Sequence, residues 1–307
     1  ETDIGTQDPL LIRFGSQESL TDWSAKATNT AGDLRIGSGS EIVTAVETRQ
    51  QVLVFTDVSL HAMQFLGPPF TFGINTVSEN ITTASPLCAI AVNDNVFWMG
   101  REEFYVYAGA VNKLPCTVKD YVFSDFNEQQ IQKVTAANNS SFSEIWWFYP
   151  SASSTENDRY VIYNYQDNIW YVGTLDRTAW LDRGIFSLPI GAGADNYLFN
   201  HETGAKADGA AMTAFIESGD MGVSDGNSFS FISRVLPDLN FRETNVNETT
   251  VDFIFSAKNA PRQVAQHTNT DTVTKTSNTP VDQYTNQYQT RLRGRSFTLK
   301  VQSTNAD

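Results

Sequence analysis

The chain has 307 residues, of which 40% are hydrophobic and only 18% are charged, so it can bury a large core and resembles neither a disordered tail nor a coiled coil. Its net charge of −14 argues against a protein that grips DNA by its phosphates, because basic residues supply that affinity. No apolar run approaches the ~20 residues of a membrane-spanning helix, so we expect no membrane insertion by this chain.

The first clear strand signals lie near residue 50. Residues Gln51–Phe55 are rich in β-branched and aromatic side chains, and after a polar turn Leu60–Phe65 has the composition of a return strand. Residues 1–40, which precede this hairpin, are expected to form an N-terminal extension or a partial blade.

Three more groups of short strands follow the same plan. Their predicted strands are residues 87–92, 96–99 and 104–107, then 144–149, 159–165 and 169–172, and more weakly 178–181, 184–189 and 197–200. Phe55 and Phe97 are 42 residues apart, and Trp147 and Phe186 are 39 apart. Repeats of about 40 to 50 residues with four strands each are typical of β-propeller blades. We therefore predict an all-β fold in which residues 41–204 form β-propeller-like, repeated four-stranded meanders; a large β-sandwich is the alternative.

Residues 205–307 are predicted to form a C-terminal β region whose sequence pattern differs from that of residues 41–204. Strands are expected within 229–241, 250–255 and 291–301, and the Thr-, Asn- and Gln-rich residues 263–289 are expected to form a long exposed polar loop. This region either closes the propeller as its last blades or forms an appended sandwich.

The residues that most often carry chemistry are few and scattered. Cys88 and Cys116 lie in apolar settings and are predicted to be buried free thiols. His61, His201 and His267 lack a second ligand at metal-binding spacing, and we interpret them as structural or surface residues. The sequence has neither a nucleophile elbow nor a phosphate-binding glycine loop, so we predict no catalytic residue, no cofactor and no metal.

An aromatic cluster invites a functional interpretation. Trp146–Tyr149, together with Trp170 and Tyr171, could present a platform on which a sugar stacks. Strand alternation turns half of these side chains inward, which favours core packing. Aromatic residues are also enriched at subunit contacts, so Trp146 and Trp147 are candidate subunit-interface residues.

Three arginines alternate along one segment near the C-terminus. Arg291, Arg293 and Arg295 should share one face of an extended chain, with Gly294 leaving the backbone open. In so acidic a chain their expected partners are carboxylates of the same or a neighbouring subunit, and phosphate binding is the alternative. All three are candidate subunit-interface residues.

From about Arg35 to Val301 the order of these features resembles the head-to-tail stabilisation proteins of short-tailed bacteriophages, which form the tail hub or nozzle. The matching positions are Val52–Phe65, Gly67–Phe72, Ala89–Gly109 with Asn93, Asp94, Phe97, Trp98, Gly100 and Tyr105, Glu217–Asp220, Asp225–Asn227 before Phe231, and Arg291, Arg293, Gly294 and Arg295.

This resemblance implies a virion protein, made in the host cytoplasm, that carries no catalytic residue. Its expected partners are copies of itself in a homo-hexamer ring below the portal and adaptor, a portal-side or adaptor protein at one end, and distal tail or fibre proteins at the other. Genomic DNA would pass through the ring without specific binding, and we expect Asp and Glu to be enriched on the loops that face the channel.

Two other functions remain open at this point. One is a carbohydrate-binding or receptor-binding propeller, for which Trp146–Tyr149 would be the motif. The other is a propeller glycoside hydrolase, which would need two carboxylates facing each other across a cavity.

Overall fold

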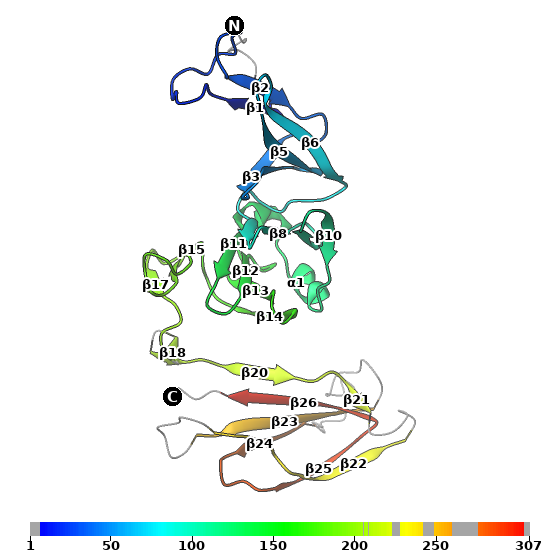
Figure 1. The fold of residues 1–307 in the computed structure, drawn as a ribbon. Coiled ribbons are helices and arrows are strands. Elements are labelled where there is room, and N and C mark those ends of the chain that lie inside the picture. The colour runs from blue at the N-terminus through cyan, green and yellow to red at the C-terminus, as the bar shows by residue number, and fades with distance from the viewer. Residues whose placement is uncertain are drawn as a thin grey trace. The chain divides into compact units, whose positions relative to one another are not determined.

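The computed structural model describes residues 7–204, 206–207, 209–222, 228–241, 249–259 and 276–303, and it confirms the predicted all-β, propeller-like fold (Figure 1). The chain divides into two compact units, Glu1–Glu202 and Thr203–Asp307. The sequence analysis had put this boundary between residues 204 and 205. Each unit is described by itself below.

Unit 1 contains four successive antiparallel sheets, which we call blades 1 to 4. Within each blade, strands that follow one another in the chain are neighbours in the sheet. Blade 1 comprises β3 (Ile42–Glu47), β4 (Val52–Thr56), β5 (Ser59–Gly67) and β6 (Thr71–Glu79); blade 2 comprises β7 (Ala89–Val92), β8 (Asn95–Met99), β9 (Phe104–Tyr107) and β10 (Val111–Leu114). Blade 3 comprises β11 (Thr135–Asn139), β12 (Glu144–Tyr149), β13 (Arg159–Asn164) and β14 (Ile169–Thr174); blade 4 has three strands, β15 (Ala179–Leu181), β16 (Ile190–Ala192) and β17 (Leu198–Asn200).

The first strands of the four blades lie side by side. β3 contacts β7, β7 contacts β11, and β11 contacts β15. Leu87 and Thr135 form a parallel bridge, and the Ala136 amide donates to the Leu87 carbonyl at 2.7 Å. The four strands begin 44 to 47 residues apart. First strands that lie next to one another, with a parallel bridge between blades 2 and 3, arrange the blades around an axis, as in a propeller and unlike two facing sheets.

Two short helices connect blade 2 to blade 3. The helix α1 (Lys119–Ser124) buries Val122, and the 3₁₀ helix η1 (Glu128–Lys133) buries Ile131. The Asn127 side chain accepts a hydrogen bond from the Gln129 amide and so caps the start of η1. These turns carry the chain from the last strand of blade 2 back to the axis, where β11 begins.

The core of unit 1 lies between the blades and is rich in aromatic side chains. Trp98 contacts Phe55 of blade 1 at a ring-centroid distance of 5.1 Å and stacks on Tyr105 at 5.2 Å. Trp147 has no exposed surface, and its indole Nε1 donates to the Cys88 carbonyl at 2.9 Å. One fully buried indole thus joins blade 3 to the segment before β7, and apolar burial holds successive blades together.

Replacing Trp147 by Ala should therefore lower the free energy of unfolding by ~3 to 5 kcal/mol, because the change opens a cavity between two blades. Tyr171, on β14 of the same blade, is 45% exposed and provides the control. Tyr171→Ala should cost less than about 1 kcal/mol. Urea denaturation followed by circular dichroism measures both variants, and equal losses would contradict this account of the core.

Both cysteines are free thiols, in agreement with the sequence-based prediction that they form no disulfide. Cys88 is fully buried, whereas Cys116 is only partly buried. Burial raises the pKa of the Cys88 thiol, and burial also raises the pKa of Cys116 to about 11. At neutral pH both thiols therefore remain protonated, and the thiolate is the reactive form.

We expect neither cysteine of the folded chain to react readily with Ellman's reagent at pH 8. With a pKa of about 11, the thiolate fraction of Cys116 at that pH is on the order of 0.1%. Guanidinium should release two fast-reacting thiols, and Cys116→Ser should reduce that number to one. A native Cys116 that reacts as fast as free cysteine would show that its surroundings do not suppress ionisation.

A hairpin before blade 1 covers the outer face of that blade. It consists of β1 (Leu11–Phe14) and β2 (Gly32–Arg35), paired antiparallel. Leu10 and Ile36, which lie side by side at the open end of the hairpin, form a small core with Val54 of blade 1. Arg13 and Asp33 are paired on the other face and are exposed. The hairpin is thus apolar toward the blade and charged toward solvent, as a capping element must be.

Unit 2 is built from a five-stranded and a two-stranded sheet that share one core. One sheet contains β20 (Ala214–Glu217), β21 (Met221–Gly222), β23 (Val251–Lys258), β24 (Thr276–Val281) and β26 (Ser296–Ser303), and the other pairs β22 (Ser230–Val235) with β25 (Tyr288–Gly294). A separate hairpin pairs β18 (Lys206–Ala207) with β19 (Ala210–Ala211). Phe253, Phe255 and Phe297 of the first sheet pack against Leu292 of the second.

Two expectations for this unit were wrong. The predicted polar loop at 263–289 includes β24, which lies at an edge of its sheet, and an edge position tolerates Pro280 because no ladder donor is needed there. The predicted strand at 291–301 is two strands, β25 and β26, with the reversal at Arg295. Alternation of side chains alone did not reveal this reversal.

Candidate functional site

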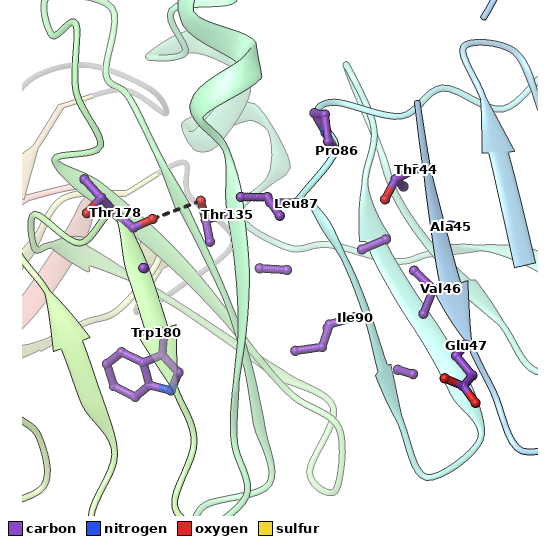
Figure 2. Close-up of a pocket in the computed structure, with 14 residues that line it drawn as sticks. Thr44, Ala45, Val46, Glu47, Pro86, Leu87, Ile90, Thr135, Thr178 and Trp180 are labelled. Atoms are coloured by element: carbon purple, nitrogen blue, oxygen red, sulfur yellow. Dashed lines mark hydrogen bonds between the residues drawn. The ribbon is translucent and has the colours of Figure 1, made fainter. Parts of the chain in front are cut away.

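The first strands of the four blades line an open groove of about 520 Å³ on the axis of unit 1. Figure 2 shows β3 on one side of it and β15 on the other, with Leu87 and Ile90 between. The lining residues are Thr44–Glu47, Pro86, Leu87, Ala89–Ala91, Thr135, Ala136 and Thr178–Trp180. Small and β-branched residues dominate, which lets four strands approach one another closely.

The groove has little charge. Among the residues that line it, Glu47 at the end of β3 is the one ionisable side chain. Thr135 donates from its hydroxyl to the Thr178 carbonyl at 3.5 Å, which ties blade 3 to blade 4 (Figure 2). Glycoside hydrolysis of the usual kind uses two facing carboxylates, and this lining provides one.

Most of the aromatic cluster singled out in the sequence lies inside the protein, although Tyr171 is exposed. Trp147, Phe148 and Tyr149 have no exposed surface, and Trp146 stacks on Trp180 of blade 4 with ring centroids 5.5 Å apart. Core packing between blades, one of the two interpretations of the sequence, accounts for these positions. Trp147 is a candidate interface residue with no surface to offer to another subunit.

Blade 4 presents an apolar face that nothing in the described part of unit 1 covers. Its register aligns Ala179 with Ala192 and Leu198, and Leu181 with Ile190 and Asn200. Trp180 points toward blade 3. Because side chains alternate along a strand, the residues on either side of it, and those aligned with them, point away from blade 3. Leu181 is 54% exposed and Leu198 is 76% exposed. We call these six residues the open face of blade 4.

The opposite side of blade 4 is held by a compact polar cluster. The Arg177 guanidinium lies 4.2 Å from the Phe199 ring centroid, and its Nε donates to His201 Nε2 at 2.9 Å. Burial, reinforced by Arg177, lowers the pKa of His201 to about 4, so this imidazole is neutral at pH 7 and can accept the bond. A side chain on Gly191 would meet Arg177 Cδ at 2.8 Å, so the cluster requires glycine there.

His61 and His201, the two histidines among the described residues, have the structural role that we expected. His61 is buried in β5, and its two ring nitrogens lie 2.8 Å from the Ser59 hydroxyl and 3.3 Å from the Thr76 hydroxyl. His201 belongs to the cluster just described, and His267 lies outside the described residues. In the part of the chain that the structure describes, no group of three or more His, Cys, Asp or Glu side chains is placed to hold a metal ion.

The three arginines are exposed, but they do not lie along one strand, although alternation had led us to expect this. Arg291 and Arg293 belong to β25, and Arg295 lies at the reversal before β26. The guanidinium groups of Arg293 and Arg295 lie 4.7 and 5.1 Å from the Phe229 ring centroid. Within the described ranges no carboxylate pairs with these arginines, so their charges are available at the surface of unit 2.

Sequence reasoning missed the residues that matter most at blade 4. The strands β15, β16 and β17 have three residues each, too few for an alternating pattern to stand out. The sequence predicted strands at 178–181 and 197–200, which match β15 and β17, but it predicted neither the open face nor the polar cluster. Arg177 gave no signal, because its partner His201 is distant in the chain.

Comparison with known proteins gives no family. No family model matches the chain, and no curated protein matches it. Among solved structures, the chain resembles exo-β-1,3-galactanase from Phanerochaete chrysosporium, crystallised with β-1,3-galactotriose, with a TM-score of 0.33 and 9% sequence identity over 96% of this chain and 87% of that one. A likeness this weak does not establish a shared fold or activity. Among the described residues, no helix has the length and apolar character needed to span a bilayer.

Proposed function

We propose that the chain is a structural virion protein of a bacteriophage tail. It acts as a ring-forming subunit of the tail hub or nozzle, extends the channel through which DNA leaves, and helps to retain the packaged genome. Its neighbours in the ring are copies of itself, and portal-side and distal tail proteins bind the two ends of the ring.

The proposal depends mainly on a difference between the first and the last blade of unit 1. The outer face of blade 1 is covered by a hairpin with a charged outer surface, whereas Leu181 and Leu198 project from the open face of blade 4. A repeat protein that works as a monomer needs a cap at both ends. An apolar face that the described part of unit 1 leaves uncovered supports a subunit that a neighbouring copy completes.

The charge of the chain supports the second part of the proposal. An excess of 14 negative charges makes the average surface repel DNA phosphates. A wall that repels DNA lets the genome slide through without binding. The three exposed arginines of unit 2 are the exception, and in this proposal they meet carboxylates of the next subunit.

The assembly can be tested at the open face of blade 4. Leu198→Lys should weaken self-association at least about tenfold, because a charge in an apolar contact loses its hydration. Leu20, which is 92% exposed and lies in the segment between β1 and β2, gives the matched control Leu20→Lys. Analytical ultracentrifugation measures association, and negative-stain imaging should show closed rings for the wild type and the control. A wild-type chain that stays monomeric at high concentration would contradict the proposed function.

The arginines give an independent test. Replacing Arg293 and Arg295 by Ala should weaken assembly more than folding, because both guanidinium groups are exposed and their removal leaves the core of unit 2 intact. Arg101→Ala, at an exposed position in unit 1, is the control. If the double variant assembles like the wild type and melts at the same temperature, the arginines have no role at the interface.

A further inference from the structure

Two glutamates and a buried asparagine converge between blades 3 and 4, away from the axial groove and from the open face. Asn139 ends β11 and Glu144 begins β12, and the two residues are direct partners in the antiparallel register. Direct partners on one face have Cβ atoms ~5 Å apart. Glu202, which follows β17, accepts a hydrogen bond on Oε1 from Asn139 Nδ2 at 2.9 Å. Asn139 thus has Glu144 as its cross-strand neighbour and Glu202 as its hydrogen-bond partner.

The asparagine is the unusual member of this group. Asn139 has no exposed surface, and its Oδ1 has no hydrogen-bond partner within the described residues. A buried amide oxygen that forgoes a hydrogen bond costs ~1 to 3 kcal/mol. This Oδ1 belongs to the same amide whose Nδ2 donates to Glu202, so it lies within a few ångströms of that carboxylate.

The two carboxylates lack a counter-charge. In the described part of the chain, no Lys or Arg forms an ion pair with Glu144 or Glu202. Glu144 Oε2 accepts from the Trp146 indole at 3.0 Å, which fixes the side chain and leaves its other oxygen unused. Nearby Asp182 is different, because the Asn138 side chain and the amides of Ser140 and Arg183 already occupy its oxygens.

We propose that Glu144, Glu202 and the Asn139 Oδ1 form a binding site for a hard divalent cation, for which Ca²⁺ fits best. All three ligands are oxygens. Because one of them is an amide oxygen, this site is not one of the groups of three or more His, Cys, Asp or Glu side chains considered above. Calcium accepts carboxylate and amide oxygens in irregular geometry and completes its shell with water, whereas Mg²⁺ demands a near-octahedral site. Zinc is a poor fit, because the adjacent His201 nitrogen Nε2 already accepts from Arg177.

The cation would act as a clamp between two blades. Glu144 belongs to blade 3, whereas Glu202 directly follows the last strand of blade 4. Glu202 is exposed, so an ion can reach the site from solvent without unfolding. Binding would then stabilise the docking of the terminal blade, independently of whether the chain forms a ring.

Calcium titration of the chelator-treated full chain tests the site. By scanning fluorimetry, the melting temperature of the wild type should rise with the logarithm of CaCl₂ concentration, and isothermal titration should give one site in unit 1 that MgCl₂ fills more weakly. Glu144→Gln and Glu202→Gln should each abolish the shift. Glu128→Gln, an exposed acid in η1, is the matched control and should keep it.

The variants also separate a cation site from a purely structural contact. In EDTA, Glu144→Gln should melt higher than the wild type, because it removes one of two neighbouring negative charges, and in calcium that order should reverse. A wild type whose melting temperature ignores calcium would overturn the proposal. The same holds if Glu202→Gln, whose exposed position makes folding secure, responds to calcium as fully as Glu128→Gln. Neither outcome depends on the assembly measurements.

Discussion

A short β-sheet that is apolar on both faces must be covered on both faces, and most of this structure follows from that requirement. In blade 3, Trp147 faces blade 2 while its neighbour Trp146 faces blade 4. Neither side can be left to water, because each buried aromatic withdraws ~150 to 250 Å² of surface from solvent. Stacking one blade on the next around an axis satisfies this requirement for every blade except the first and the last.

The first and last blades therefore show how far unit 1 covers its own apolar faces. At the first blade the chain provides its own cover, with Ile36 and Leu10 inward and Arg13 outward. At the last blade, the described part of unit 1 provides the inner contacts of Trp180 and Arg177 and leaves Leu198 exposed. Because nothing described in unit 1 covers this face, the proposed assembly with a second copy has a physical reason, and a cation between Glu144 and Glu202 would strengthen the blade that carries the proposed contact.

Sequence patterns predicted the two middle strands of blades 1 to 3 well, but they missed the innermost strands β3 and β11 and the outermost strands β6 and β10. β8 and β12 are runs of β-branched and aromatic residues, and these runs stood out. β11 has the sequence Thr-Ala-Ala-Asn-Asn, which carries no strand signal, because a strand at a crowded axis needs small side chains. The predicted strand at 184–189 is not a strand; the chain pairs at Ile190–Ala192 instead. The Asn139 cluster could not be predicted, because its members meet only when blade 4 docks on blade 3.

The central claim is that successive meanders are arranged around one axis with their first strands innermost. An experimental structure of the full chain, by crystallography or by cryo-electron microscopy of its assembly, tests this most directly. The account predicts that β3, β7, β11 and β15 run side by side in the same direction, with Leu87 bridged to Thr135. Two broad sheets stacked face to face, with those four strands separated, would contradict it.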